Sequence, residues 1–294
     1  MYLKTKLNQA LFQKIFHVVV FIILGLFPLT GYAARSSLFL HFIDVGEGDA
    51  IFVELPGCCN FLIDTGNFKT GIDSYNFLVH AGIHHVNHLI LTHPHLDHIG
   101  GVFAITRLLS VSHLYDNGED LSVQSRTCDI YRWYRELVRD NAKYSILKTG
   151  ETLCCPPLTI KVLWPPCPHY TGDWNTNSIV LRLSFGAFHC LLMGDANAIT
   201  ERRLLASRTN LRAQVLKSGH HGAKDATTQA FLSAVSPDTV IISVNKDNIR
   251  GYPAQVTLQR IKKVHAKILR TDRNGTITIK AYPDGSFKVL TELP

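Results

Sequence analysis

The chain has 294 residues, of which 46 % are hydrophobic and 18 % are charged. This length and composition allow a substantial buried core and exclude a disordered, collagenous or coiled-coil protein. The formal net charge of +7 is compatible with a phosphodiester substrate, but it is too small to identify a nucleic-acid binder by itself.

The N-terminal segment differs from the rest of the chain. Three lysines and no acidic residue precede an almost purely apolar stretch at 18–29, and small residues follow it up to Ala34. This order is typical of a secretory signal peptide at 1–33 and predicts a periplasmic or secreted mature chain. The alternative is an uncleaved membrane anchor, although 18–29 is short for a span, which needs about 20 residues. Cleavage would remove three lysines and lower the formal charge to +4.

The first half of the mature chain predicts strands, followed by alternating helices and strands. Runs of aliphatic and aromatic residues predict strands at 37–44, 49–55, 60–64 and 88–91. Helical spacing of apolar residues predicts helices at 72–81, 100–109 and 129–140. His84, His85 and His88 precede or begin the last strand, and we expect them on a surface turn.

The second half repeats this pattern. Strands are predicted at 159–164, 179–184, 189–193, 214–217 and 239–243, and helices at 198–206, 227–235 and 254–264. A hairpin is predicted at 276–290, around Pro283, Asp284 and Gly285. Strands followed by helices, twice over, predict an α+β protein in which two sheets pack together with helices outside. No linker divides 34–294, so we expect a single domain there.

The most distinctive stretch, at 91–101, reads L-T-H-P-H-L-D-H-I-G-G. His93 and His95 are two residues apart, so in an extended segment their side chains share a face. Asp97 and His98 follow in a tighter turn. Imidazoles with one carboxylate suit a divalent ion such as zinc, with manganese or iron as alternatives.

This motif at a strand end resembles the H-x-H-x-D-H signature of the metallo-β-lactamase superfamily. The resemblance covers nearly all of the mature chain and is strongest to the hydrolase domain of the ComEC-type competence family, which functions in DNA uptake. The segments that carry it, in the family's order, are 41–50, 64–66, 91–101, 175–181, 191–195 and 216–222. The resemblance implies a four-layer αβ/βα sandwich. The part of the family's sequence that forms the membrane channel has no counterpart here, so we expect a stand-alone hydrolase domain.

The resemblance also implies a metal centre, most simply with two zinc ions; manganese or a single metal are alternatives. The implied ligands are His93, His95, Asp97, His98, Asp195 and His220. The first two would bind one ion, the next two the other, and Asp195 would bridge them. His220 would complete the second set, with His221 as an open alternative. Asp97 and Asp195 are also the predicted catalytic residues, with Asp97 orienting a water or accepting its proton.

Other residues are predicted to support the ligands or contact substrate. Asp44 and Asp64, at strand ends, would orient imidazole rings or cap turns. Asn177 and Ser178 stand in the loop where many members of the superfamily carry a further histidine, so the first ion would be weakly held or completed by water.

Two further residues are candidates for contact with substrate. Tyr252 stands where the competence family tends to have a histidine, and it would donate a hydrogen bond or act as an acid. Lys217 either faces an anionic substrate or is solvated, and we expect the solvated side chain.

The seven cysteines occupy positions 58, 59, 128, 154, 155, 167 and 190. In an oxidising compartment some would pair, and the odd number leaves at least one unpaired. The vicinal pairs lack C-x-x-C spacing, so we do not assign them to zinc. We expect a disulfide between elements, with its pairing left open.

The leading hypothesis is an exported, metal-dependent phosphodiesterase or nuclease that acts on DNA in a competence context. A membrane competence channel is a predicted partner, and no small-molecule cofactor beyond metal is expected. One alternative is hydrolysis of a lactone, thioester or β-lactam on the same fold. Another is a non-catalytic module that only binds nucleic acid.

Overall fold

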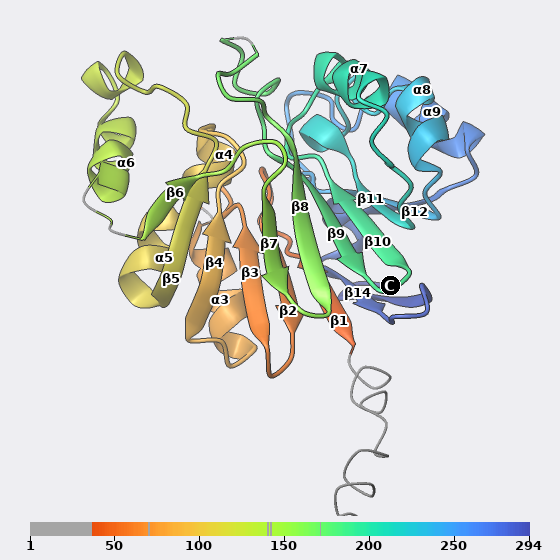
Figure 1. The fold of residues 1–294 in the computed structure, drawn as a ribbon, viewed down its shortest axis with the longest axis horizontal. Helices are drawn as coiled ribbons and strands as arrows, with labels where there is room; N and C mark the ends of the chain where they lie inside the picture. Colours follow the sequence, from red (N-terminus) through yellow and green to blue (C-terminus); the bar gives the residue numbers. More distant parts are fainter. Residues whose placement is uncertain (1–36, 70, 140, 142, 171) are drawn as a thin grey trace, which may run out of the picture. The chain divides into compact units, whose positions relative to one another are not determined.

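Two β-sheets stack face to face, and helices cover their outer surfaces (Figure 1). The computed structural model describes residues 37–294, except for residues 70, 140, 142 and 171. The predicted leader at 1–33 lies outside the described residues. Across the described range, no helix combines the length and apolar character needed to cross a membrane.

The first sheet contains eight strands within the described range, in the order β15-β14-β1-β2-β3-β4-β5-β6. Strands β15 to β3 pair antiparallel, and β3 to β6 pair parallel. Their bounds are β1 Leu38–Phe42, β2 Ile51–Leu55, β3 Cys59–Ile63, β4 His85–Ile90, β5 Ser110–Asp116, β6 Tyr144–Ile146, β14 Ile277–Ala281 and β15 Phe287–Thr291.

The second sheet contains seven strands within the described range, in the order β13-β12-β11-β10-β9-β8-β7. Strands β13 to β10 pair parallel, and β10 to β7 pair antiparallel. Their bounds are β7 Thr152–Cys155, β8 Leu158–Trp164, β9 Val180–Phe185, β10 Phe188–Leu192, β11 Val215–Lys217, β12 Thr239–Ile242 and β13 Lys267–Arg270. Each sheet therefore has one parallel half and one antiparallel half.

Three apolar clusters hold the layers together. One lies between the sheets, a second joins the first sheet to α3, α5 and α6, and a third joins the second sheet to α7, α8 and α9. The helices are α3 Gly71–His80, α4 Leu96–Ile99, α5 Val102–Leu108, α6 Asp129–Arg139, α7 Ala198–Ala206, α8 Gln229–Val235, α9 Gln255–Lys263 and α10 Thr271–Asn274, with short 3-10 turns η1 Gln124–Arg126 and η2 Gly219–Gly222. The predicted α+β four-layer sandwich is confirmed.

Most predicted elements occur within a few residues of their expected bounds, but four strands were missed: β5, β6, β7 and β13. Strand β5 reads S-V-S-H-L-Y-D, and its polar residues hide the strand pattern. The expected surface turn at His85 and His88 is wrong, because β4 begins at His85 and carries both side chains. His88 stacks on Phe61 of β3, with ring centroids 4.6 Å apart.

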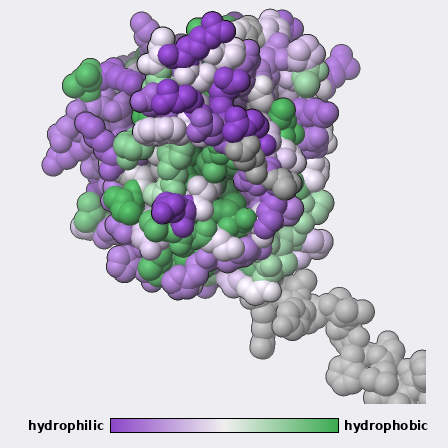
Figure 2. Space-filling view, turned by 90° about the vertical axis from the view of Figure 1, so that its left-hand side faces the viewer, coloured by the Kyte–Doolittle hydropathy of each residue, from purple (hydrophilic) through white to green (hydrophobic). Residues whose placement is uncertain are grey.

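The face on the side of α5, α6 and β6 is partly apolar. Figure 2 shows apolar side chains gathered in the middle of this face and hydrophilic ones around them. The exposed large apolar residues of these three elements include Leu108, Trp133 and Ile146, each about half exposed at 52 %, 45 % and 48 %.

Candidate metal centre

The candidate ligands lie where strands of both sheets end. Strand β4 leads into the 91–101 motif, where α4 holds Asp97 and His98. In the second sheet, β10 leads to Asp195, and β11 leads to the η2 turn with His220 and His221. Strand ends from two stacked sheets thus bring together residues that are far apart in the sequence, such as His98 and His221.

One group of ligand atoms, which we call the His221 group, consists of Asp97, His98 and His221, and these atoms lie within 4.8 Å of one another. Asp195 Oδ1 lies 3.3 Å from both His98 Nε2 and His221 Nε2. His221 Nε2 also lies 3.7 Å from Asp97 Oδ2. Donor atoms around a tetrahedral zinc ion, with bonds of about 2.0–2.1 Å, are separated by roughly 3.3 Å. The spacing therefore suits a small divalent cation.

Four of these ligand atoms lack hydrogen bonds within the part of the chain that the structure describes. Asp97 Oδ2, His98 Nε2, Asp195 Oδ1 and His221 Nε2 are all buried without a hydrogen-bond partner among the described residues. A buried polar atom without a partner is destabilising, so native proteins contain few of them. Four such atoms from three separate segments converge here, and the residues fit a divalent metal ion.

A second group, which we call the His95 group, consists of His93, His95 and the other oxygen of Asp195. His93 Nε2 lies 2.9 Å from His95 Nδ1 and 3.7 Å from Asp195 Oδ2. Thr92 donates its hydroxyl proton to Asp64, so the same hydroxyl accepts from His93 Nδ1 at 3.1 Å. This bond puts the ring proton on Nδ1 and leaves Nε2 unprotonated, so the Nε2 lone pair is available to a proton or to a metal ion. Asp195 thus presents one carboxylate oxygen to each group, as a bridging ligand requires.

The adjacent histidines of η2 lie on different sides of Asp195. His221 belongs to the His221 group, whereas His220 Nε2 lies 3.9 Å from Asp195 Oδ2, the oxygen of the His95 group. Both residues have positive φ angles, 46° and 51°, which are uncommon for side chains with a Cβ. The resemblance had placed His220 in the second set and left His221 open; in the structure, His221 is the histidine that lies with Asp97 and His98.

Asn175 is a site residue that the sequence analysis missed. Its Nδ2 lies 3.4 Å from His220 Nε2, its side chain lies near enough to His95 to influence the pKa of that ring, and its Oδ1 is buried without a partner in the described range. The sequence analysis had put Asn177 at this place. Asn177 instead donates to Glu119 Oε1 at 2.8 Å, in a loop contact. The two asparagines are two residues apart in a turn, and no signal in the sequence distinguishes them.

Three polar groups orient the ligands. His98 Nδ1 donates to Asp64 Oδ2 at 2.8 Å, and His221 Nδ1 donates to the carbonyl of Ser243 at 3.0 Å. The backbone N–H of Asp195 donates to Ser178 Oγ at 3.2 Å. Such bonds fix the tautomer and the direction of a metal-binding imidazole. Asp64 and Ser178 therefore lie where supporting residues were expected.

Lys217 is fully buried, so the expected solvated side chain is wrong. Its ammonium group donates to Asp49 Oδ2 at 2.7 Å and to the carbonyl of Ser218 at 3.0 Å. Asp49 Oδ1 in turn lies 3.7 Å from His221 Nδ1. Asp49, which the sequence analysis did not single out, neutralises Lys217 and connects this ion pair to the metal centre. A lysine in the interior requires such a partner.

The loop before Asp49 contacts α4 directly. Gly48 has a φ of +107°, and a Cβ at this position would lie 1.8 Å from the carbonyl oxygen of Asp97. The N–H of Asp49 also donates to that carbonyl at 3.3 Å. Only glycine allows this approach, which fixes the backbone of the Asp97 ligand.

The protonation of the centre is set by burial and by neighbouring charges. Burial and the nearby His98 hold the pKa of His93 well below its ordinary value, so His93 is neutral and able to bind a metal. Burial alone would raise the pKa of Asp195, but His221 and His98 hold it well below its ordinary range. Despite burial, Asp195 and Asp64 hold the pKa of His98 well above its ordinary value. Carboxylates that favour a proton on His98 would equally favour a metal cation.

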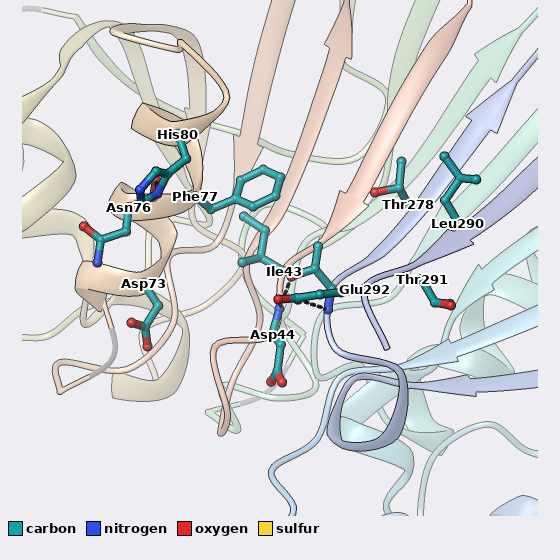
Figure 3. Close-up of a pocket in the computed structure, with 11 residues that line it drawn as sticks. Ile43, Asp44, Asp73, Asn76, Phe77, His80, Thr278, Leu290, Thr291 and Glu292 are labelled. Carbon is teal, nitrogen blue, oxygen red and sulfur yellow. Dashed lines mark hydrogen bonds between the residues drawn. The ribbon is translucent and has the colours of Figure 1, made fainter. Parts of the chain in front are cut away.

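Tyr252 and Asp44 differ in their relation to the centre. The Tyr252 hydroxyl lies 3.4 Å from His220 Nε2, on the rim of the site. Asp44 is exposed, and its Oδ1 accepts from the N–H of Gly46 at 3.1 Å, as a turn cap does. Asp44 also lines a separate pocket of about 570 Å³ between α3 and the β14–β15 hairpin (Figure 3). No candidate metal ligand lines that pocket.

This arrangement of strand-end ligands between two stacked sheets agrees with the family comparison. The family model of the metallo-beta-lactamase superfamily matches residues 43–244, and the chain belongs to this superfamily. Its curated relatives are bacterial proteins, one of which is named a competence protein. It is 29 % identical over 319 residues to ComE operon protein 3 of Bacillus subtilis (strain 168), covering 98 % of this chain and 39 % of that protein. It is 28 % identical over 239 residues to Competence protein ComA of Neisseria gonorrhoeae, covering 80 % and 31 %.

The chain therefore spans less than half the length of these relatives. Among solved structures, it is similar in fold to CmlA, a diiron beta-hydroxylase from Streptomyces venezuelae, with a TM-score of 0.53 and 15 % identity. That similarity covers 86 % of this chain and 54 % of CmlA. The chain is thus a member of the metallo-beta-lactamase superfamily with a competence protein among its relatives.

Proposed function

We propose that this protein is a metal-dependent phosphodiesterase that cleaves DNA outside the cytoplasm. The observation that carries the proposal is the convergence of four buried, unpartnered ligand atoms around the shared carboxylate of Asp195. The relation to competence proteins supports DNA as the substrate. Because the chain covers only part of those proteins, their activities enter here as part of the proposal.

In the proposed centre, His93 and His95 would hold one ion, and Asp97, His98 and His221 the other, with Asp195 between them. Zinc suits this mixture of imidazole and carboxylate ligands, and manganese is an alternative. Divalent ions bound there would lower the pKa of a coordinated water and offset charge on the attacked phosphate.

The chain's own side chains would position the substrate and the proton. Asp97 is the more exposed of the two carboxylates of the centre, at 13 % against 2 % for Asp195, and it would orient the attacking water and accept its proton. On the other side of Asp195, Tyr252 and His220 lie 3.4 Å apart and would donate hydrogen bonds to the phosphate oxygens. Trp174 packs against His95, with ring centroids 5.2 Å apart, and would cover one side of that ligand.

We also propose that residues 1–33 are an export leader and that residues 34–294 form the hydrolase domain, with a membrane channel as a partner. The basic, apolar and small-residue order of the leader supports this, as does the compact unit that starts at Ser37. N-terminal sequencing of the chain from the periplasmic fraction tests it. An intact leader in the membrane fraction would indicate an anchor instead.

The activity is tested with the purified mature chain and bis(p-nitrophenyl) phosphate, single-stranded DNA and duplex DNA, each with zinc or manganese. We expect hydrolysis that disappears with chelator and in Asp97→Asn. The matched control is Asp44→Asn, because this carboxylate lies in a separate pocket and its loss should leave turnover intact. Turnover of a lactone, thioester or β-lactam without phosphodiester hydrolysis would contradict the proposal. DNA binding without cleavage at any divalent ion would contradict it as well.

A further inference from the structure

The tips of the β2–β3 and β7–β8 hairpins meet at the end of the sandwich that lies away from the candidate metal centre. Cys59 is the first residue of β3 and Cys155 is the last residue of β7, and a disulfide joins them. Asp64 follows the opposite end of β3, so the disulfide and the metal ligands lie at opposite ends of the strands (Figure 1). The bond ties the first sheet to the second across a sequence separation of 96 residues.

A third sulfur lies against this disulfide. Cys58 is exposed and carries a free thiol, and its Sγ lies 2.7 Å from Cys155 Sγ. Cys155 itself is only 6 % exposed. All three sulfurs, including that of Cys59, lie within 4.8 Å of one another. Cys155 Sγ therefore has two possible sulfur partners from adjacent residues.

The local backbone explains why both neighbours reach Cys155. In a regular strand, consecutive side chains point to opposite faces. Cys58, however, belongs to the tight turn before β3, where Gly57 has a φ of +75° and Cys58 N donates to the Leu55 carbonyl at 2.9 Å. The turn frees Cys58 from the alternation of the strand. Its side chain consequently faces the β7–β8 tip, 3.8 Å from the carbonyl of Pro156.

We propose that Cys58, Cys59 and Cys155 form a thiol–disulfide exchange site that carries the bond between the sheets in two interchangeable forms. The Cys58 thiolate attacks Cys155 Sγ, a Cys58–Cys155 bond forms, and the Cys59–Cys155 bond breaks. The electron pair of the broken bond leaves on Cys59 Sγ, which takes up the proton that Cys58 lost. One disulfide and one thiol are present before and after, so no oxidant or reductant is consumed.

The exchange has a consequence for chemistry at the surface. The exposed thiol at Cys58 is the point at which a small thiol or disulfide of the glutathione class can enter. Either internal form keeps the two hairpin tips joined, because both bonds end on Cys155. Exchange therefore replaces one disulfide partner of Cys155 by its neighbour in the sequence, and the two sheets stay joined. This inference does not depend on the proposed hydrolysis.

Labelling of Cys59 tests the exchange in the full mature chain. The folded protein is incubated with iodoacetamide at about pH 8, where thiolates form, then digested without reduction and analysed by mass spectrometry. Exchange releases Cys59, so wild type should give two labelled products: one with label on the exposed Cys58 and a Cys59–Cys155 disulfide, and one with label on Cys59 and a Cys58–Cys155 disulfide. Cys58→Ser retains the Cys59–Cys155 bond and should show about tenfold less label on Cys59. Equal labelling of Cys59 in both proteins would overturn the proposal.

A second variant asks whether Cys58 can take over the bond. Cys59→Ser, refolded in a glutathione redox buffer, should form Cys58–Cys155, whereas Cys58→Ser/Cys59→Ser should leave Cys155 alkylated. Circular dichroism establishes that each variant is folded before the peptides are mapped. A folded Cys59→Ser chain in which Cys155 stays free, or pairs with Cys154 or Cys128, would overturn the proposal.

Discussion

The His221 group and the His95 group share Asp195, but their imidazole rings are held differently. In the His221 group, His98 donates to the carboxylate of Asp64 and His221 donates to the carbonyl of Ser243. In the His95 group, His93 has only the hydroxyl of Thr92 behind it, and His95 packs against Trp174. The nearby His220 has a buried Nδ1 without a hydrogen-bond partner among the described residues.

This difference indicates which of the two groups is preorganised for a metal ion. A ring fixed by a carboxylate or carbonyl keeps its tautomer and is a more basic ligand. We therefore expect the His221 group to retain its ion under conditions that empty the His95 group. The buried pair of Asp49 and Lys217 also lies beside His221. The following changes test this comparison, from the largest expected effect to the smallest.

Asp195→Ala removes the oxygen that each group needs. We expect both groups to lose their ions and phosphodiester hydrolysis to fall by more than about 100-fold, the upper range for residues that only orient a ligand. Elemental analysis of the purified chain and hydrolysis of bis(p-nitrophenyl) phosphate measure these effects. Asp44→Ala is the control, and it should keep its metal. Full metal content in Asp195→Ala would show that the two groups do not share this ligand.

His221→Ala and His220→Ala separate the neighbouring histidines. His221→Ala should release the ion of the His221 group and abolish most activity. His220→Ala should keep that ion and lower hydrolysis by about tenfold, because His220 lies beside the opposite oxygen of Asp195. Zinc titration of the two chelated variants by calorimetry measures the difference. Loss of the tighter ion in His220→Ala would show that His220, and not His221, holds that ion.

Lys217→Met tests the ion pair beside His221. The change leaves Asp49 buried without its partner, so we expect a loss of about 3–5 kcal/mol in the free energy of unfolding. Asp49→Leu/Lys217→Met should recover most of this loss, because neither charge remains. Urea unfolding at neutral pH measures both.

The pH dependence of the stability of wild type and the double variant follows from the ionisation of Asp49. Burial would raise the pKa of Asp49, but Lys217 and His221 hold it below its ordinary value. Its stabilising contribution is thus present above about pH 4 and is lost as the pH falls through the lowered value. The double variant should lose less stability than wild type below about pH 4. Equal acid sensitivity would contradict the role given to Asp49.

Asn175→His is expected to have the smallest effect. It should reduce the difference in metal affinity between the His221 group and the His95 group. The new imidazole would lie beside His95 and His220, where it adds a preferred zinc ligand, and we expect about tenfold tighter binding of the weaker ion. Asn177→His is the matched control. Asn177 binds Glu119 and is fully buried, so this change should lower stability without tightening metal binding. A similar gain in both variants would contradict the assignment of Asn175.

The strands with a regular apolar pattern could be predicted from the sequence. The candidate metal centre could be located because its polar residues follow the ends of such strands. Asp195 and the 91–101 motif follow strands directly, so their convergence is a property of the sheets. The choice between His220 and His221 was beyond the sequence, because it depends on two consecutive left-handed residues. The burial of Lys217 was also out of reach, since its partner Asp49 is 168 positions away. Strand β5 was missed because its exposed residues, Ser110 and His113, are polar, and β6 was missed because it has only three residues.

The division of the ligands between two sheets also has a consequence for how the protein folds. His93, His95, Asp97 and His98 belong to the first sheet, whereas Asp195 and His221 belong to the second, and no metal-binding set is complete before the sheets dock. Contacts this distant in sequence form slowly, because the loop between them must close first. In a refolding experiment, the uptake of zinc should follow sheet docking rather than the formation of secondary structure. The metal would then report the last step of folding.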